Sequence, residues 1–405
     1  ILEWMPGYNR QMLANDGMAG LIVAIMLVPQ GMAYALLAGL PPEVGLYASI
    51  VPLIFYGLLG RSRALAVGPV AIVSLMVATT LGTLAEAGSV GYVAGDVLLA
   101  FLSGAVLLGM GLARLGFLVN FLSHPVSSGF SSAAALVIGF SQLKHLLGFD
   151  IPRSHLITET IGHAITHIGQ INLATFGIAA VSLTILLVWK GRMTGWMKGA
   201  GVNASVTDAV SKSGPLVAVL VTTLAVWFFG LNQSASVSIV ADIPAGLPPF
   251  AMPAFDLALM QQMLPAALLI SLVGFLESVS VAKSLASKRR QKIDANQELV
   301  ALGAANIGAS FTGGYPVTGG FSRSLVNFTA GAVTPLASII TAVLVGVTVL
   351  LLTPLLYFLP KATLAAVIVV AVANLIDFKI VRETWAYNKT DALSLIVTFV
   401  AVLTI

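Results

Sequence analysis

Hydrophobic residues gather in stretches of about twenty along the whole chain, which is the length that a helix needs to cross a lipid bilayer. Short segments richer in Gly, Pro, Lys and Arg separate these stretches. The short-period alternation that is typical of a membrane β-barrel is absent from the sequence. We therefore predict an all-α polytopic membrane protein whose spans cover residues 14–37, 44–59, 69–82, 96–112, 125–147, 171–189, 215–229, 263–285, 295–311, 321–330, 333–352, 361–376 and 393–405.

The composition supports this pattern, since 58% of the 405 residues are hydrophobic and only 9% are charged. A soluble domain carries about 25% charged residues. Lys and Arg follow the second, fourth, sixth, eighth and twelfth spans. Because positively charged loops stay in the cytoplasm, we predict a cytoplasmic N-terminus. The net charge of +4 then indicates orientation in the membrane rather than a nucleic-acid partner.

A weak internal repeat relates the two halves of the chain. The segment "GLLGRSRALAVGPVAI" (57–72) aligns with "GASFTGGYPVTGGFSR" (308–323), so that Pro69 falls on Gly320 and Ile72 on Arg323. Seven spans in the first half would turn the second half upside down, which is the inverted-repeat design of secondary transporters. We predict a first repeat over residues 1–230, an extracellular connector over 231–262, and a second repeat over 263–405 whose seventh span lies outside this sequence.

The third and tenth spans are short, and Gly- and Pro-rich sequence precedes each of them: "ALAVGPV" (64–70) and "TGGYPVTGG" (312–320). Irregular backbone is tolerated at membrane depth only where protein or a water-filled cavity surrounds it. Interrupted segments at matching places in two repeats are a sequence indication of a transporter's binding site. We predict two half-helices, beginning near Pro69 and Phe321, whose positive N-termini meet and favour an anion.

Arg323 would lie in the first turn of the second half-helix, where a buried charge is costly. The sequence allows an arginine that binds a substrate anion, or a structural arginine that pairs with Glu277 or with backbone carbonyls. Ser322 and Ser324 can cap the half-helix or donate to a substrate oxygen. Asn327, one turn later, is predicted to support Arg323 rather than to touch the ligand.

Three further polar residues lie inside predicted spans. Glu277 is predicted to couple transport to protons or to pair with Arg323, a fixed ion pair being the alternative. Gln30 and Tyr34 lie on one face of the first span and are predicted to contact the ligand, although a hydrogen bond between helices and aromatic packing would explain them too. Asn306 is a weaker candidate for which a structural role is the better interpretation.

Other chemistry finds little support. The chain has no cysteine and no P-loop, which excludes thiolate metal sites and ATP-driven transport. The "HAITH" pair (163–167) lacks a third metal ligand, and the Ser-rich "HPVSSGFSS" (124–132) lacks a general base for an intramembrane hydrolase. We predict no cofactor and no metal.

Three segments resemble the sulfate permease (SulP) family of anion transporters: "PQGMAYALLAGLPPEVGLYASIVPLIFYGLLGRSRALAVGPVAIVSLM" (29–76), "DANQELVALGAANIGASFTGGYPVTGGFSRSLVN" (294–327) and "FLPKATLAAVI" (358–368). The resemblance implies a seven-plus-seven inverted repeat with a core of spans one to four and eight to eleven, and a gate of spans five to seven and twelve to fourteen. It also implies an anion site formed by Gln30, Tyr34, Pro69, Val70, Ser322 and Arg323, with Glu277 nearby. A STAS domain after span fourteen, a homodimer and an elevator-like movement of the core are further implications.

These inferences together predict a secondary active transporter of a small anion of the sulfate, bicarbonate or dicarboxylate class, in a bacterial inner membrane and not an enzyme. The acidic residue at position 277 favours symport with H⁺, or with Na⁺, by alternating access. The alternatives are an anion channel, a transporter of an uncharged ring such as a nucleobase, and a membrane sensor or enzyme that transports nothing.

Overall fold

The computed structural model describes residues 5, 7–120, 124–152, 157–201, 207, 210–244 and 246–404, and it is almost entirely helical there. Five helical segments of this part are long and apolar enough to cross a membrane: Arg10–Ala38, Pro42–Leu59, Val90–Leu112, Leu257–Lys288 and Leu336–Leu356. The bent pair Leu173–Trp189 and Gly191–Met197 would make a sixth, and three shorter apolar helices cover Ala71–Gly82, Gly214–Phe229 and Lys361–Ala373. The polytopic prediction is therefore confirmed.

The chain divides into two compact units, each assembled from separate parts of the sequence. Unit 1 comprises Ile1–Val119, Arg192–Leu216 and Asp242–Leu355. Its elements are α1 (Arg10–Ala38), α2 (Pro42–Tyr47), α3 (Val51–Leu59), β1 (Val67–Gly68), α4 (Ala71–Gly82), α5 (Val90–Leu112), α13 (Leu257–Lys288), α14 (Ala295–Phe311), β2 (Thr318–Gly319), α15 (Phe321–Thr329) and α16 (Leu336–Val347).

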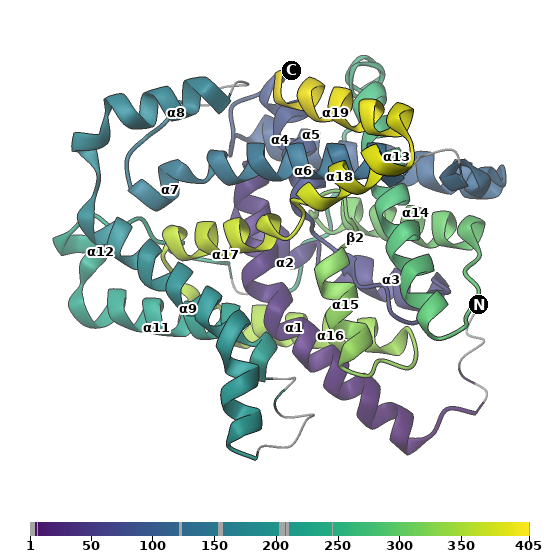
Figure 1. Cartoon of the computed structure of the whole chain (residues 1–405), viewed down its shortest axis with the longest axis horizontal. Helices are drawn as coiled ribbons and strands as arrows, with labels where there is room; N and C mark the ends of the chain where they lie inside the picture. The colour runs from purple at the N-terminus through teal and green to yellow at the C-terminus, as the bar shows by residue number, and fades with distance from the viewer. Residues whose placement is uncertain are drawn as a thin grey trace. The chain divides into compact units, whose positions relative to one another are not determined.

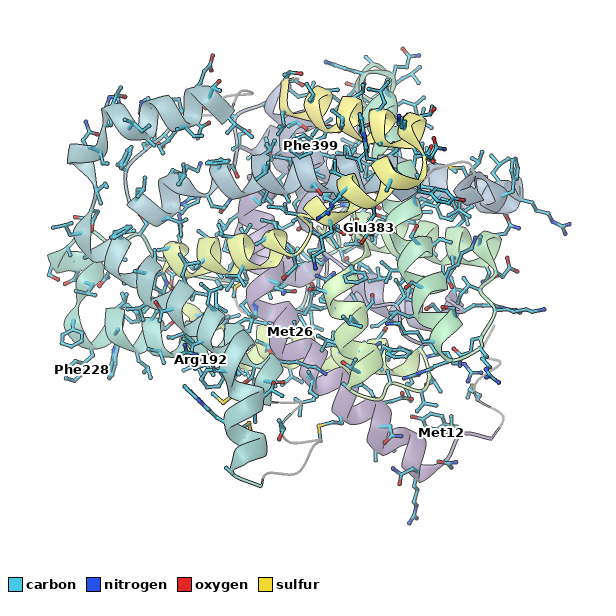
Figure 2. The ribbon with its side chains drawn as sticks, viewed as in Figure 1. Met12, Met26, Arg192, Phe228, Glu383 and Phe399 are labelled. Atoms are coloured by element: carbon cyan, nitrogen blue, oxygen red, sulfur yellow. The ribbon has the colours of Figure 1, made fainter. Side chains whose placement is uncertain are left out.

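In unit 1, the long helices surround the two short strands and the short helices that follow them. α1 packs against α2, α4, α15 and α16, while α5 packs against α13 and α14 (Figure 1). Met26, halfway along α1, is buried among these neighbours (Figure 2). The core of this unit is rich in small residues, and an added methyl group at Gly45 would lie 2.0 Å from the carbonyl oxygen of Gly31. Such close backbone contact is the way helices pack where lipid supplies no hydrophobic driving force.

Unit 2 comprises Asn120–Gly191, Val217–Ala241 and Leu356–Ile405. It contains α6 (His124–Ser141), α7 (Leu143–Leu147), α8 (Ile157–Thr166), most of α9 (Leu173–Gly199), α11 (Gly214–Phe229), α12 (Leu231–Ser234), α17 (Lys361–Ala373), α18 (Phe378–Tyr387) and α19 (Lys389–Thr404). α6 packs against α17 and α19. Phe228, at the end of α11, projects away from the unit (Figure 2) and is 75% exposed, as suits a lipid-facing side chain.

The sequence-based boundaries differ from the structure in several places. α5 begins at Val90 rather than 96, where Ser89 caps it by accepting from the N–H of Tyr92 at 3.2 Å. α13 begins at Leu257 rather than 263 and is capped by Asp256. α18 was not expected, because its residues are too polar for a span. The predicted span 333–352 is α16 followed by a π-helical turn, Thr348–Leu352.

The two half-helices and their extended approaches are present as predicted. β1 leads into α4 and β2 into α15, although α4 begins at Ala71, two residues later than expected. The two strands pair antiparallel, with Val67 opposite Gly319 and Gly68 opposite Thr318. The repeat alignment, which pairs residue 57 with residue 308, also pairs Val67 with Thr318 and Gly68 with Gly319. In the ladder each of these residues lies opposite the repeat equivalent of the other, which is the register that a two-fold axis between the repeats requires. The weak sequence repeat therefore describes a real structural relation.

Candidate functional site

The pairing of β1 with β2 brings the N-termini of α4 and α15 together. Val70 and Gly320 precede these helices with extended backbone, and neither N-terminus receives a hydrogen bond from a capping side chain. The first N–H groups of a helix have no partner within the helix, and they carry about half a positive charge. Two such ends facing one place form a cradle that suits an anion.

Arg323 reaches from α15 across this cradle. A methyl group built at Gly320 would lie 3.1 Å from its Nη2 atom, and one built at Gly68, in β1, would lie 3.4 Å from the same atom. Gly68 has φ +145°, a conformation that only glycine adopts easily, so glycine both shapes β1 and leaves room for the guanidinium. Arg323 is only 2% exposed, and its Nε and Nη2 atoms have no hydrogen-bond partner among the described residues.

The structure does not contain the fixed Arg323–Glu277 pair that the sequence left open. Tyr34, Tyr315 and Glu277 lie within electrostatic range of Arg323. Yet the Oε2 atom of Glu277 has no hydrogen-bond partner in the part of the chain that the structure describes, and Arg323 and Glu277 form no ion pair there. The positive and negative groups are therefore near each other without satisfying each other, which leaves hydrogen-bonding capacity for a ligand or a proton.

Ser324 and Asn327 hold the cradle rather than line it. Ser324 accepts a hydrogen bond from the backbone N–H of Ala66 at 2.9 Å and donates to the carbonyl of Gly320 at 2.7 Å. Asn327 donates to the carbonyl of Ala64 at 3.1 Å. Both side chains therefore connect α15 to the segment before α4.

Most of the polar groups that support β2 were not predicted from the sequence. Ser278 on α13 accepts from the N–H of Gly319 at 2.8 Å, and its hydroxyl lies 2.6 Å from that of Thr318. Asn306 on α14 accepts from the N–H of Val317 at 2.8 Å and donates to the carbonyl of the same residue at 3.0 Å. Asn306 thus has the structural role that the sequence favoured. A buried amide in an otherwise apolar span was the available signal, since buried polar groups need partners.

The remaining predicted residues differ in their exposure. Pro69 and Val70 are buried at the start of α4. Gln30 and Tyr34 are buried on α1, which packs against both half-helices. Tyr34 interacts electrostatically with Arg323 and Glu277. Ser322 is exposed, so its hydroxyl is accessible from outside the protein interior.

The histidines add nothing to this site. His163 on α8 of unit 2 stacks on His167, which directly follows this helix, with ring centroids 4.0 Å apart. His155 lies outside the described residues. Within the described part of the chain, no group of three His, Asp or Glu side chains is arranged to hold a metal ion.

Comparison with known proteins gives a consistent result. The family model described as "Sulfate permease family" matches residues 13–398. "Sulfate transporter 4.1, chloroplastic" of Arabidopsis thaliana is 43% identical over 96% of this chain and 55% of its own length. The chain therefore spans about half the length of this curated relative.

Two solved structures share the fold. The anion transporter solute carrier 26 family member A9 of mouse, in an inward-facing state, has a TM-score of 0.91 and 28% identity, covering 99% of this chain and 67% of that chain. The transmembrane domain of the cyanobacterial bicarbonate transporter BicA has a TM-score of 0.84 and covers 98% of this chain and 97% of its own, at 21% identity, and this likeness shows the fold alone. Both have the inverted-repeat fold with core and gate, which confirms the predicted fold class. The proteins of this family are transporters rather than enzymes, as expected. The chain belongs to the sulfate permease family.

Proposed function

We propose that the chain is the membrane part of a secondary active transporter that carries a small anion of the sulfate, bicarbonate or dicarboxylate class. The observation that carries this proposal is the unpartnered guanidinium of Arg323 between two uncapped half-helix N-termini. A buried cation with two unused donor atoms is costly, and an anion in the cradle would relieve that cost. The sulfate transporters among the compared proteins support an anion of this class as the substrate.

Within this proposal, the anion is bound by Arg323 and by the N–H groups at the start of α4 and α15. Ser322 donates a further hydrogen bond, and Gln30 and Tyr34 close the site from α1. Hydrogen bonds to charged groups contribute about 1.5–3 kcal/mol each. Loss of one such hydrogen bond from the guanidinium would therefore weaken anion binding by roughly tenfold to 150-fold.

Glu277 would couple anion movement to protons. Its unpartnered Oε2 atom lies in the electrostatic range of Arg323, so the anion and the carboxylate compete for the same positive charge. Protonation of Glu277 removes that competition and favours co-transport of H⁺ with the anion. Unit 1 would serve as the core and unit 2 as the gate of an alternating-access cycle, in a homodimer embedded in a bacterial inner membrane.

Uptake of radioactive sulfate into proteoliposomes under an inward proton gradient would test the anion site. We expect saturable uptake by the wild-type protein and loss of at least tenfold in Arg323→Ala. Arg323→Lys should recover only part of the activity, because lysine keeps the charge but not the planar fork of donors. Arg382→Ala, which removes an exposed arginine of α18, is the matched control and should transport normally. Unchanged uptake by Arg323→Ala would contradict the site assignment. Steady single-channel currents in place of saturable uptake would favour a channel.

The coupling assignment needs a separate measurement of internal pH during uptake. Wild-type vesicles should acidify when sulfate enters, whereas Glu277→Gln should carry sulfate without acidification or fail to concentrate it against a gradient. Acidification that persists in Glu277→Gln would exclude Glu277 as the coupling residue. A sodium requirement without acidification would point to Na⁺ instead.

A further inference from the structure

One arginine closes both the long helix α13 and the half-helix α15. The backbone N–H of Arg289 bonds to the carbonyls of Ala286 and Ser287 and ends α13. Its side chain reaches the other helix, where Nη2 donates to the carbonyl of Phe328 at 3.0 Å and Nη1 donates to the carbonyl of Ala332. The last carbonyls of a helix lack partners within it and carry partial negative charge, so a cation is favourable at this end of α15.

This contact suits arginine in particular. The guanidinium carbon of Arg289 lies 4.2 Å from the centre of the Phe328 ring, so the cation also covers an aromatic face. A planar fork can donate to two carbonyls while it stays on the ring, which the single ammonium group of a lysine does not reproduce. The next residue, Arg290, is exposed, so the two adjacent arginines differ in their surroundings.

The beginning of the segment that contains β2 and α15 (residues 318–329) is fixed to the same long helix. The hydroxyl of Thr318 donates to the carbonyl of Gly274 at 2.6 Å, and the N–H of Gly319 donates to the hydroxyl of Ser278 at 2.8 Å. Arg323 lies between this attachment and the one at the end of α15. α13 therefore holds the segment on both sides of Arg323.

The double attachment relates the two charged residues of the proposed site. Glu277 is next to Ser278 on α13, and Arg323 is in the first turn of α15, which α13 holds. Contacts near β2 fix where the nine-residue helix α15 begins. The contact at its far end adds control of the direction in which α15 runs, and hence of the direction in which it presents Arg323.

Other contacts at the far end of α15 join it to different elements. Asp16 on α1 accepts from the backbone N–H and the hydroxyl of Thr334, at 3.0 and 2.6 Å. Lys212, before α11, donates to the hydroxyl of Thr329 at 2.6 Å. Arg289 differs from these two residues because it connects this end to α13, the helix that carries Glu277.

We propose that Arg289 is a positioning residue of the transporter: by holding the end of α15 against α13, it fixes the direction in which Arg323 meets the anion. It acts through the half-helix rather than on the anion, and this role rests on the anion site proposed above. Its loss should weaken sulfate binding by roughly two- to thirtyfold, the range that such indirect substitutions span. The turnover rate at saturating sulfate should stay within about twofold of the wild type, because the groups that bind the anion remain present.

Initial rates of radioactive sulfate uptake into proteoliposomes, measured over a range of sulfate concentrations and normalised to folded protein, separate KM from kcat. We expect Arg289→Ala to raise KM for sulfate, and Arg289→Lys to give an intermediate value, because lysine keeps the charge but not the two-pronged contact. Arg290→Ala is the matched control, since it removes the same charge from the neighbouring exposed position, and its KM should equal that of the wild type. Denaturant unfolding of the same preparations measures stability separately.

A purely structural role of Arg289 predicts a different pattern. Arg289→Ala would then lower the yield or the unfolding midpoint and leave KM unchanged, and this result would overturn the proposal. An equal rise of KM in Arg290→Ala would overturn it too, because the effect would come from the charge alone. If Arg289→Ala does not fold, Arg289→Lys decides: a raised KM supports the two-carbonyl contact, and a wild-type KM overturns it. Absence of saturable sulfate uptake by the wild type would instead contradict the proposed function.

Discussion

Asn306 provides a sharp test of how the cradle is held, because one side chain satisfies both backbone groups of Val317. Its amide accepts from the Val317 N–H at 2.8 Å and donates to the Val317 carbonyl at 3.0 Å, and all of these groups are buried. Asn306→Leu keeps the branched shape and the number of side-chain heavy atoms but can make neither bond. Each buried group left without a partner costs about 1–3 kcal/mol. The expected destabilisation is therefore roughly 2–6 kcal/mol, before any relaxation of β2.

The assay combines unfolding of the detergent-solubilised protein by denaturant with sulfate binding by the part that remains folded. We expect Asn306→Leu to unfold at a lower denaturant concentration and to bind sulfate more weakly, since Val317 leads directly into β2 and α15. Ser310→Ala is the control, because Ser310 is buried one turn later on α14 and bonds only to a carbonyl of its own helix, that of Ile307. An Asn306→Leu protein as stable as Ser310→Ala would refute the reasoning. Reduced stability with unchanged sulfate affinity would show that the two hydrogen bonds between Asn306 and Val317 do not position the cradle.

Three other substitutions test separate contacts by the same unfolding assay and by the yield of monodisperse protein. Gly45→Ala should abolish folding, because its methyl group would lie 2.0 Å from the carbonyl oxygen of Gly31, whereas Gly17→Ala on α1 has open space and should gain about 0.5–1 kcal/mol. Glu298→Ala should cost roughly 3–6 kcal/mol, since two backbone N–H groups and a tyrosine hydroxyl lose their acceptor, while Glu298→Gln should cost much less. Ser324→Ala should cost about 1–3 kcal/mol by leaving an N–H before β1 without an acceptor. If Gly45→Ala, Glu298→Ala or Ser324→Ala is as stable as the wild type, the contact assigned to that residue is contradicted.

Local sequence features predicted the elements of this fold well where composition changes abruptly. Glycine and proline before residues 71 and 321 marked the two half-helices, because such sequence cannot continue a regular helix. The starts of α5 and α13 were predicted too late, because the hydropathy of each helix decreases before its N-terminal boundary is reached. The capping residues Ser89 and Asp256 would have located them.

The candidate site was predictable in part for a similar reason. A lone arginine or glutamate in an apolar span is conspicuous, so Arg323 and Glu277 could be singled out from the sequence. Ser278 and Thr318 are far apart in the chain, and only the folded structure shows that their hydroxyl groups lie within hydrogen-bond distance of each other.

The antiparallel pairing of β1 with β2 has a mechanical consequence. Main-chain contacts join the two repeats at this point, including the hydrogen bond from the N–H of Gly320 to the carbonyl of Ala66 at 3.1 Å. Tilting either half-helix alone would therefore break these main-chain hydrogen bonds, and a buried backbone group that loses its partner is costly. In the transport cycle proposed above, α4 and α15 are therefore expected to move together as one rigid body, with the same contacts to the anion on both sides of the membrane. Pairs of spin labels at the outer ends of α4 and α15 should accordingly report one distance throughout the transport cycle.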